Sequence, residues 1–299
     1  MKKLFLLLVS MCVLITSCGK ENMGESNSGN NVENNEGSNT TPDEPEISAD
    51  RIITYEALND REIEFKSWAD ITSHTYENGI GEIVFAETVT KIGYYAFEWC
   101  SIVRCTLPNT VAAIEAGAFR DCQYLEYINI PNSVKSIKEW AFYRCVMPSI
   151  TLSNNLEVIG AHAFNECRSL LEITIPNSVT SIETNAFKDC NLLEKVIIGN
   201  NVKTIGDEAF RDCAIKSITL PNSVQSIGDR AFEGCWDLQQ VYCKRTTPPT
   251  VSSEYGRVLG LFRDTHRDIK IYVPRNSVDT YKTDAHWKKY ASIIVGYDF

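Results

Sequence analysis

The chain has 299 residues, enough for one large domain or two ordinary ones, and its formal net charge is −10. This acidic balance, without a basic stripe, argues against a nucleic acid as partner, because phosphates require clustered Lys and Arg. An acidic, solvated surface accounts for the charge.

The first eighteen residues have the pattern of an export signal. Lys2 and Lys3 precede an apolar run, Leu4 to Ile15, that is too short to span a bilayer as a helix. The end of this run, Ile15-Thr16-Ser17-Cys18, resembles a bacterial lipobox. In that family the Cys is lipidated and becomes the new N-terminus, so we expect a signal peptide at 1–17 and a lipid anchor on Cys18 as the only membrane attachment. An ordinary secretory signal is the alternative.

The residues after Cys18 are polar and small. Gly19-Lys20-Glu21 resembles the surface-export signal of Bacteroides-type lipoproteins, which implies an outer-membrane protein facing the cell exterior. Residues 18–50 are rich in Asn, Ser, Gly and Glu, and they lack the apolar residues that offset the entropy of ordering. We predict a lipidated, flexible tether over this range.

Residues 51–79 lack the periodic pattern that begins at Ile80. Ile52–Tyr55 and Glu62–Phe65 are interpreted as two strands around a turn at Asn59 and Asp60. Because a stack of repeats must have its first apolar face covered, we predict an N-terminal cap here. A separate binding module is the alternative.

Residues 80–243 repeat one unit, which occurs seven times in full with a step of 22 or 23 residues. Each copy contains a Phe and a Cys, at positions 97 and 100, 119 and 122, 142 and 145, 164 and 167, 187 and 190, 210 and 213, and 232 and 235. A period of about 20–29 residues with a Leu-x-x-Leu-x-Leu core is typical of leucine-rich-repeat solenoids, in which each side chain lies over its own copy.

Each repeat divides into three pieces. In Leu125-x-x-Ile128-x-Ile130 alternate residues are apolar, which predicts a short strand that pairs in parallel with its copies, beginning with an earlier rung at Ile83 and Phe85. Val-x-x-Ile returns apolar residues to the core, and Ala-Phe-x-x-Cys has the spacing of a helical turn. A polar slot that includes Thr110 and Ser133 is expected to satisfy buried turn amides.

The repeat residues resemble the BspA-like class of leucine-rich repeats, found in surface proteins of anaerobic bacteria and some protists. The resemblance covers Ile80 to Cys243. It implies a right-handed, curved α/β solenoid with a parallel sheet on one face and short helical turns on the other. It also implies adhesion to host matrix proteins or to other cell-surface proteins.

Residues 244–299 depart from the period, since Phe262 follows Phe232 by 30 residues. Ile269-x-Ile271-x-Val273 restores a strand, so we predict an expanded last repeat followed by an amphipathic C-terminal cap. A ligand-binding aromatic cluster is the alternative for the cap, Ser277 to Phe299. The solenoid is therefore expected to be capped at both ends.

The cysteines occupy apolar repeat slots, which favours free, buried thiols over disulfides, because buried Cys behaves as a small hydrophobe. The chain has no Cys-x-x-Cys motif, and its four His share no metal spacing, so neither a metal nor a cofactor is expected. His162 lies in a slot also filled by Gly117, Trp140 and Glu208, which predicts a surface residue. No catalytic motif is present, and we expect no enzyme activity.

The outward strand positions form the candidate ligand surface. Its proposed members are Arg104, Tyr127, Glu172, Lys195, Ile197, Gln240 and Tyr242. Tyr is common in binding hot spots, although Thr at neighbouring positions is simply a good strand residue. Three hypotheses are consistent with this surface: a lipid-anchored adhesin for proteins, a glycan-binding protein for nutrient capture, and a purely structural envelope protein. The glycan hypothesis predicts clustered exposed aromatic residues, and Trp99, Trp140 and Trp236 do not share one slot, which disfavours it.

Overall fold

The computed structural model describes residues 46–59, 61–252 and 260–299. The chain separates into two units, Met1–Glu46 and Ile47–Phe299, and the described strands and helices belong to the second. The predicted signal peptide, the lipid anchor at Cys18 and most of the predicted tether lie outside the described residues. They stay predictions.

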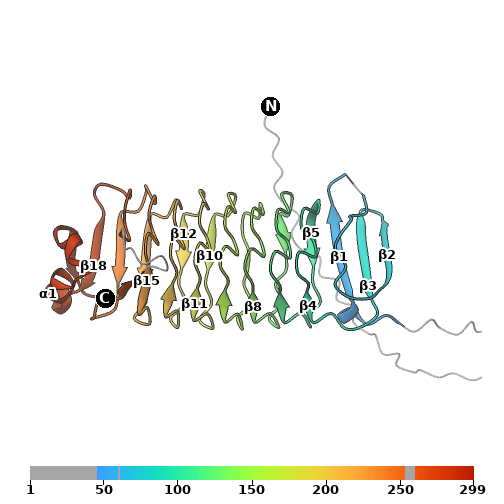
Figure 1. Ribbon diagram of the computed structural model, residues 1–299, viewed down its shortest axis with the longest axis horizontal. Coiled ribbons are helices and arrows are strands. Elements are labelled where there is room, and N and C mark those ends of the chain that lie inside the picture. Colours follow the sequence, from blue (N-terminus) through green and yellow to red (C-terminus); the bar gives the residue numbers. More distant parts are fainter. Residues whose placement is uncertain (1–45, 60, 253–259) are drawn as a thin grey trace, which may run out of the picture. The chain divides into compact units, whose positions relative to one another are not determined.

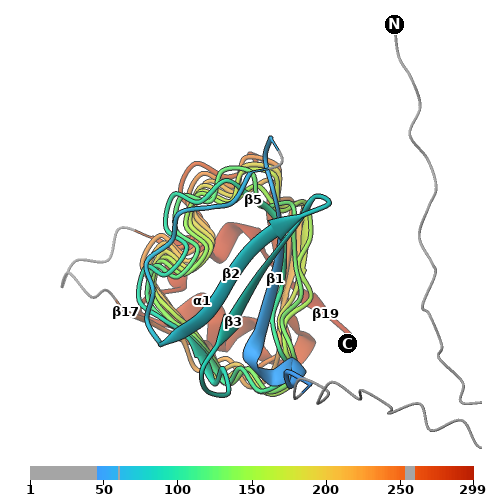
Figure 2. The same ribbon diagram turned by 90° about the vertical axis from the view of Figure 1, so that its right-hand side faces the viewer.

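The second unit is a solenoid in which each sequence repeat forms one coil. Figure 1 shows the coils stacked side by side along one axis, and Figure 2 shows them superimposed when seen end-on. The predicted repeat solenoid with parallel strand pairing is thereby confirmed. The Leu-x-x-Ile-x-Ile pieces form its first strand column: β5 (Ile102–Thr106), β7 (Tyr127–Ile128), β10 (Glu172–Thr174), β12 (Lys195–Ile197), β14 (Ser217–Leu220), β16 (Gln240–Cys243) and β18 (Lys270–Pro274).

The Val-x-x-Ile pieces form a second sheet that sequence reasoning did not anticipate. Within the described ranges its eight strands pair in parallel without a break, because each donates and accepts hydrogen bonds at the same two positions. The strands are β4 (Lys91–Ile92), β6 (Ala113–Ile114), β8 (Ser136–Ile137), β9 (Val158–Ile159), β11 (Ser181–Ile182), β13 (Thr204–Ile205), β15 (Ser226–Gly228) and β17 (Thr250–Ser252).

The first strand column is interrupted at the coil of Ile150. That coil makes a single bridge, Ser149 to Glu172, and forms no ladder with β7 among the described residues. Pro148 stands where neighbouring coils have Glu126 and Leu171, whose N–H groups donate to the coil before. Because Pro has no N–H to donate, the ladder ends there.

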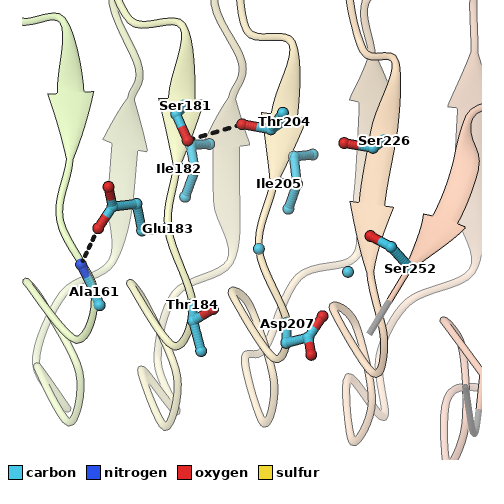
Figure 3. A pocket seen from close by; sticks show the side chains of 12 residues that line it. Ala161, Ser181, Ile182, Glu183, Thr184, Thr204, Ile205, Asp207, Ser226 and Ser252 are labelled. Atoms are coloured by element: carbon cyan, nitrogen blue, oxygen red, sulfur yellow. Dashed lines mark hydrogen bonds between the residues drawn. The ribbon is translucent and has the colours of Figure 1, made fainter. Parts of the chain in front are cut away.

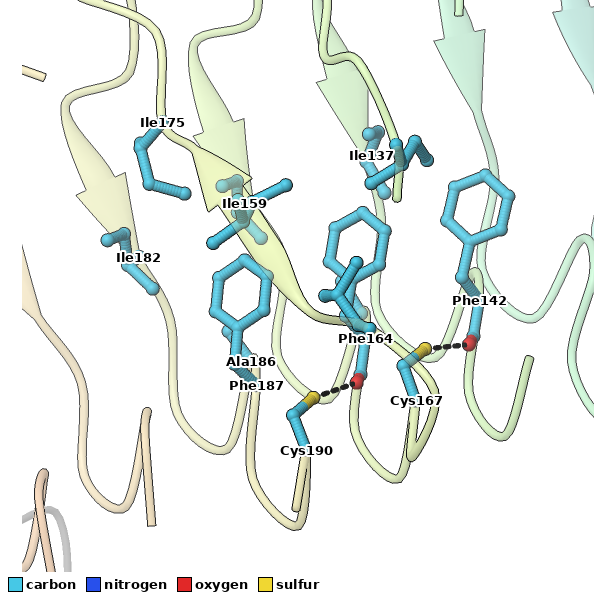
Figure 4. Close-up of a cluster of buried hydrophobic side chains, with 14 of the residues drawn as sticks. Ile137, Phe142, Ile159, Phe164, Cys167, Ile175, Ile182, Ala186, Phe187 and Cys190 are labelled. Atoms are coloured by element: carbon cyan, nitrogen blue, oxygen red, sulfur yellow. Dashed lines mark hydrogen bonds between the residues drawn. The ribbon is translucent and has the colours of Figure 1, made fainter. Parts of the chain in front are cut away.

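The phenylalanines form one buried column through the stack. Successive rings from Phe97 to Phe262 lie 5.1–5.7 Å apart between centroids and are nearly parallel, with interplanar angles of 1–16°. Figure 4 shows Phe142, Phe164 and Phe187 in this arrangement. Apolar burial of this kind, repeated at each coil, supplies most of the driving force for folding.

The cysteines lie beside this column, and the nine described thiols are free and buried, as predicted. They also do something that the sequence did not indicate. Cys167 Sγ donates a hydrogen bond to the carbonyl of Phe142, and Cys190 Sγ to that of Phe164, both at 3.1 Å (Figure 4). The same bond recurs from Cys122 to Cys235, so each of these six thiols satisfies a carbonyl of the preceding coil.

The prediction that the side chains of the polar slot satisfy buried turn amides is wrong. Thr110 Oγ1 donates to the carbonyl of Val89 at 2.8 Å, and Ser133 Oγ to that of Val111 at 2.6 Å. These hydroxyls therefore satisfy carbonyls of the preceding coil and not turn amides. The N–H groups of Val111 and Val134 bond within their own turns, to the carbonyls of Pro108 and Pro131.

The Ala-Phe-x-x-Cys piece is a succession of tight turns and not a helical turn. Two positions in each coil have left-handed backbone, for example Trp140 with φ 60° and Arg144 with φ 58°. Left-handed residues interrupt helical repetition. The turns instead bond to the next coil, as Phe142 N–H does to the carbonyl of Ala163 at 2.8 Å.

At the N-terminal end, η1 (Ala49–Arg51) leads into β1 (Ile52–Ala57), and β2 (Ile71–Glu77) pairs antiparallel with β3 (Ile80–Phe85). The predicted parallel neighbour relation between the Ile83 rung and the next coil is wrong. β1 lies between β3 and β5 and pairs antiparallel with both. Figure 2 shows these strands lying across the end of the stack.

The predicted strand Glu62–Phe65 is also wrong, and Asp60 of its predicted turn lies outside the described residues. The segment replaces the missing coil before Phe97. Phe65 lies 5.4 Å from the Phe97 ring, and Glu64 offers its carbonyl to Cys100 Sγ at 3.0 Å. These contacts take the place of strand pairing, because the open face of the phenylalanine column needs a cover.

At the C-terminal end, the last coil is followed by η2 (Arg275–Ser277), α1 (Val278–Thr283), η3 (Lys288–Ile293) and β19 (Ile294–Tyr297). Tyr281 and Trp287 are fully buried, and the Trp287 ring meets Phe262 edge-on. β19 pairs in parallel with β18, which adds a further strand to the first column.

Candidate binding face

The candidate residues lie on the outward side of the first strand column, here called the sheet face. Alternate strand residues point outward, and register places their copies in two rows. The first row is Arg104, Tyr127, Ser149, Glu172, Lys195, Ser217, Gln240 and Lys270. The second row includes Thr106, Thr174, Ile197, Thr219, Tyr242, Tyr272 and Val295.

Three of the four charged members of the first row, Arg104, Glu172 and Lys195, have charged or aromatic partners, whereas Lys270 forms no ion pair among the described residues. The Arg104 guanidinium lies 4.5 Å from the centroid of the Tyr127 ring and 3.5 Å from Glu56. Lys195 Nζ lies 3.1 Å from Glu172 Oε2. Exposed pairs of this kind contribute about 0–1 kcal/mol each, so their main consequence is that charge is locally neutralised at Arg104, Glu172 and Lys195.

The second row carries no acidic or basic side chain from Thr106 to Val295. Its first part is mainly Thr, and its later part becomes apolar at Ile197, Tyr242, Tyr272 and Val295. Ile197 is 48% exposed and Val295 is 39% exposed. Exposed apolar residues in one row mark an interaction surface more often than scattered ones do.

The later part of the row ends in an aromatic cluster formed by Tyr242, Tyr272, Tyr297 and Phe299. The Tyr242 and Tyr272 rings stack at 4.8 Å with an interplanar angle of 15°. Tyr297 meets both rings edge-on, at 5.4 and 5.6 Å, and Phe299 lies 5.1 Å from Tyr297. Partial burial raises the pKa of the Tyr242 hydroxyl above its usual value, so the hydroxyl is neutral at physiological pH.

Sequence reasoning named Tyr242 but missed the other three residues. A signal was present, because Tyr272 follows Tyr242 by the same 30 residues that separate Phe262 from Phe232. The structure thus brings Gln240 next to this cluster, where its Oε1 accepts a hydrogen bond from the Tyr242 hydroxyl at 3.2 Å. Arg104 and Tyr127 lie several coils away, and Glu172, Lys195 and Ile197 lie between the two groups.

Two hollows open on opposite strand columns. The first, here called the Ile197 hollow, lies at the ends of β10, β12 and β14 and is lined by Ile197, Thr174, Thr219, Pro176, Pro221 and Lys244, among others. The second lies along the other sheet, where Figure 3 shows Ser181, Thr204 and Ser226 in a line. Some of its polar groups bond to each other: Thr204 Oγ1 donates to Ser181 Oγ at 2.8 Å, and Glu183 accepts from the Ala161 N–H at 2.9 Å.

The turns form a third surface, on which the expectation for His162 needs correction. His162 is half-buried, because its ring stacks on Trp140 at 3.8 Å and contacts Asn165 at 2.8 Å through Nδ1. Nearby, burial raises the pKa of Glu166, but hydrogen bonds from Arg144 and Tyr143 outweigh it and hold that pKa below its usual value. This surface is thus internally paired.

Two features bear on chemistry and on membranes. Across residues 46–59, 61–252 and 260–299, no group of three or more His, Cys, Asp or Glu side chains is arranged to hold a metal ion. In the same ranges no helix has both the length and the apolar character needed to cross a bilayer.

Stacked coils with parallel strands, a buried phenylalanine column and a repeat of 22 or 23 residues define a leucine-rich-repeat solenoid. The chain belongs to the BspA type leucine rich repeat family, which matches it in six copies over residues 55–171, 90–214 and 157–252.

The comparison with solved structures finds similar bacterial proteins. A leucine-rich repeat protein from Bacteroides ovatus ATCC 8483 is 23% identical, with 71% of this chain and 70% of that chain covered and a TM-score of 0.37. The T. pallidum leucine rich repeat protein TpLRR is 32% identical, with coverages of 56% and 68% and a TM-score of 0.40. The pneumococcal vaccine antigen PcpA is 14% identical, with coverages of 79% and 91% and a TM-score of 0.29. No curated protein matches the chain.

Proposed function

We propose that this protein is a non-catalytic adhesin of the cell surface that binds another protein through its sheet face. The observation that carries the proposal is the second row, which is uncharged, becomes apolar at Ile197 and ends in the cluster of Tyr242, Tyr272, Tyr297 and Phe299. Aromatic anchors beside neutralised charges are what protein-binding surfaces require. The expected partner is a host matrix protein or another cell-surface protein.

A glycan is the second candidate, and the aromatic cluster is the observation that favours it. Sugar rings bind to open aromatic faces. Tyr242 and Tyr272 each cover one face of the other's ring at 4.8 Å, which reduces the open aromatic face that a sugar could contact. The charged first row beside the apolar second row also suits the mixed surface of a protein better than that of a neutral glycan. A purely structural envelope role is the third possibility.

The location of the protein at the cell surface is part of the proposal. It is supported by the Ile15-Thr16-Ser17-Cys18 sequence and by Lys20-Glu21 after it. Lipidation on Cys18 would tether the solenoid to the outer membrane. Replacement of Cys18 by Ala should release the protein from membranes and abolish labelling with a fatty acid. Retention of the variant in the membrane fraction would refute the anchor.

Arrays of immobilised matrix proteins and glycans test the binding function directly. The purified chain is compared with the double variant Tyr242→Ala/Tyr272→Ala. The matched control is Trp99→Ala/Trp236→Ala, which removes two aromatic residues that are 63% and 65% exposed outside the sheet face. We expect a protein signal that falls at least about tenfold in the tyrosine variant and persists in the tryptophan variant.

Each other outcome favours a different function. Signals on glycans alone would replace the adhesin with the glycan-binding protein. Loss of a protein signal in the tryptophan variant, with no change in the tyrosine variant, would move the site to the turns. Absence of signal on both arrays would favour the structural role.

A further inference from the structure

The Ile197 hollow is named for an exposed aliphatic side chain that does not pack in the core of the stack. Other second-row residues from Thr106 to Thr219 are Thr or Asn, whereas Ile197 is aliphatic and 48% exposed. It lies between Thr174 and Thr219 in register, so it contributes nothing to the buried interior. An exposed aliphatic residue inside a concavity is the usual floor of a site for an apolar group.

The lining of the hollow is both apolar and polar. Pro176 and Pro221 flank Gly199 at the strand ends, and Asn177 and Asn200 stand at the turns. The Asn200 N–H is held by Asn177 Oδ1 at 2.7 Å, which fixes the rim. Asn200 is exposed, so its side-chain amide can form hydrogen bonds with a peptide backbone.

One end of the hollow is positively charged. Lys244 lines it, and within the described residues no acidic side chain lies within ion-pair distance of its ammonium group. The adjacent Arg245 bonds only to neutral groups there, with Thr247 Oγ1 at 2.9 Å and the carbonyl of Asn222 at 3.3 Å. In a chain of net charge −10, two cations without acidic partners favour an anionic ligand group.

We propose that the Ile197 hollow is an anchor pocket for a polypeptide segment in which an aliphatic residue is followed by an acidic one. The aliphatic side chain lies on Ile197 between Thr174 and Thr219, and the carboxylate pairs with Lys244. This inference rests on the proposed function, since it names the part of a protein partner that the sheet face receives. The second row continues from the pocket through Tyr242 and Tyr272, which provide further contacts along the stack.

Capped dipeptides test the pocket without knowledge of the partner. The full chain, labelled at Ile methyl groups, is titrated with acetyl-Leu-Glu-amide, acetyl-Leu-Lys-amide and acetyl-Ser-Glu-amide. We expect saturable shifts of the Ile197 methyl with the first peptide, and at least about threefold weaker binding of the other two. Equal affinity for all three peptides would overturn the proposal.

Two variants and one matched control locate the binding. Ile197→Asp should abolish binding of acetyl-Leu-Glu-amide, observed through the methyl groups of Ile175 and Ile198, which also line the hollow. Lys244→Gln should remove the preference for Glu over Lys. Leu192→Asp introduces the same charge at a residue of the same coil that is 52% exposed and outside the hollow, and it should leave binding intact. Unchanged binding by Ile197→Asp would overturn the proposal.

Failure of the pocket and failure of the adhesin function give different results. If a protein on the array depends on Tyr242 and Tyr272 but not on Ile197, the function stands and the pocket is wrong. If acetyl-Leu-Glu-amide binds at Ile197 while the arrays give glycans alone, the pocket stands and the protein partner is wrong.

Discussion

The interior and the sheet face are made by the same coils, but they differ in how far their residues repeat. Inside, each coil contributes one Phe to a column with ring spacings of 5.1–5.7 Å. Outside, the same strands present Arg104, Tyr127, Glu172, Lys195 and Gln240 in one row. A side chain that meets its own copy must match it, whereas one that meets solvent or a partner need not. The residues that recur in each coil therefore determine the fold, and the residues that differ between coils determine binding.

The largest effect is expected from breaking the interior column. Phe164→Ala removes a fully buried ring that stacks on Phe142 and Phe187. The free energy of unfolding should fall by about 3–5 kcal/mol in urea denaturation. Phe299→Ala, which removes an exposed ring from the sheet face, is the control and should cost far less. Similar losses in both variants would erase the distinction between the two regions.

Because its thiols are buried, we expect the protein to lose stability at alkaline pH. Burial raises the pKa of Cys100 and of Cys235 from the usual value near 9 to about 12. The unfolded chain therefore loses these protons near pH 9, while the folded chain keeps them until about pH 12. The thiol contribution is complete below pH 9, and the free energy of unfolding should decline as pH rises through this window.

Denaturation at several pH values, with Cys235→Ala as the comparison, measures this effect. The variant should show a shallower decline than the parent chain. Rapid labelling of the folded protein by a thiol reagent at pH 8 would show that burial does not shield the thiols.

A smaller effect is expected from the thiol hydrogen bonds. Cys167→Val keeps an apolar residue but removes the donor to the Phe142 carbonyl. We expect a loss of about 1 kcal/mol, because a buried carbonyl loses one of its partners. The same substitution at Cys105, a buried thiol in a strand of the first column, serves as a control for the change in shape. Equal costs at both sites would leave the hydrogen bond without a measurable contribution.

The smallest effect on stability is expected on the sheet face. Ile197→Asp and Lys244→Gln should change the free energy of unfolding by less than about 0.5 kcal/mol, because both side chains are exposed. A loss comparable with that of Phe164→Ala would mean that Ile197 belongs to the interior. Thermal denaturation alongside the peptide titrations provides this measurement.

The same division explains what could be predicted from the sequence. The Phe column, the free thiols and the parallel strands were predictable because each residue occurs in copy after copy. The insertion of β1 between β3 and β5 was not, since antiparallel pairing between distant segments leaves no periodic trace. Polar and apolar residues alternate in Glu62–Phe65 as in a strand. The segment instead covers Phe97 at the open end of the stack, and this tertiary contact has no sequence pattern. The aromatic cluster was predictable in part, because Tyr272 follows Tyr242 by the same 30 residues that separate Phe262 from Phe232.

The central claim is that a partner binds the sheet face near the aromatic cluster. Oxidative footprinting of the complex with a partner found on the arrays tests it most directly. We expect protection of Tyr242, Tyr272 and Tyr297 on binding, with unchanged oxidation of Trp99 and Trp236. Protection of the two tryptophans, with the three tyrosines still oxidised at the rate of the free protein, would contradict the claim.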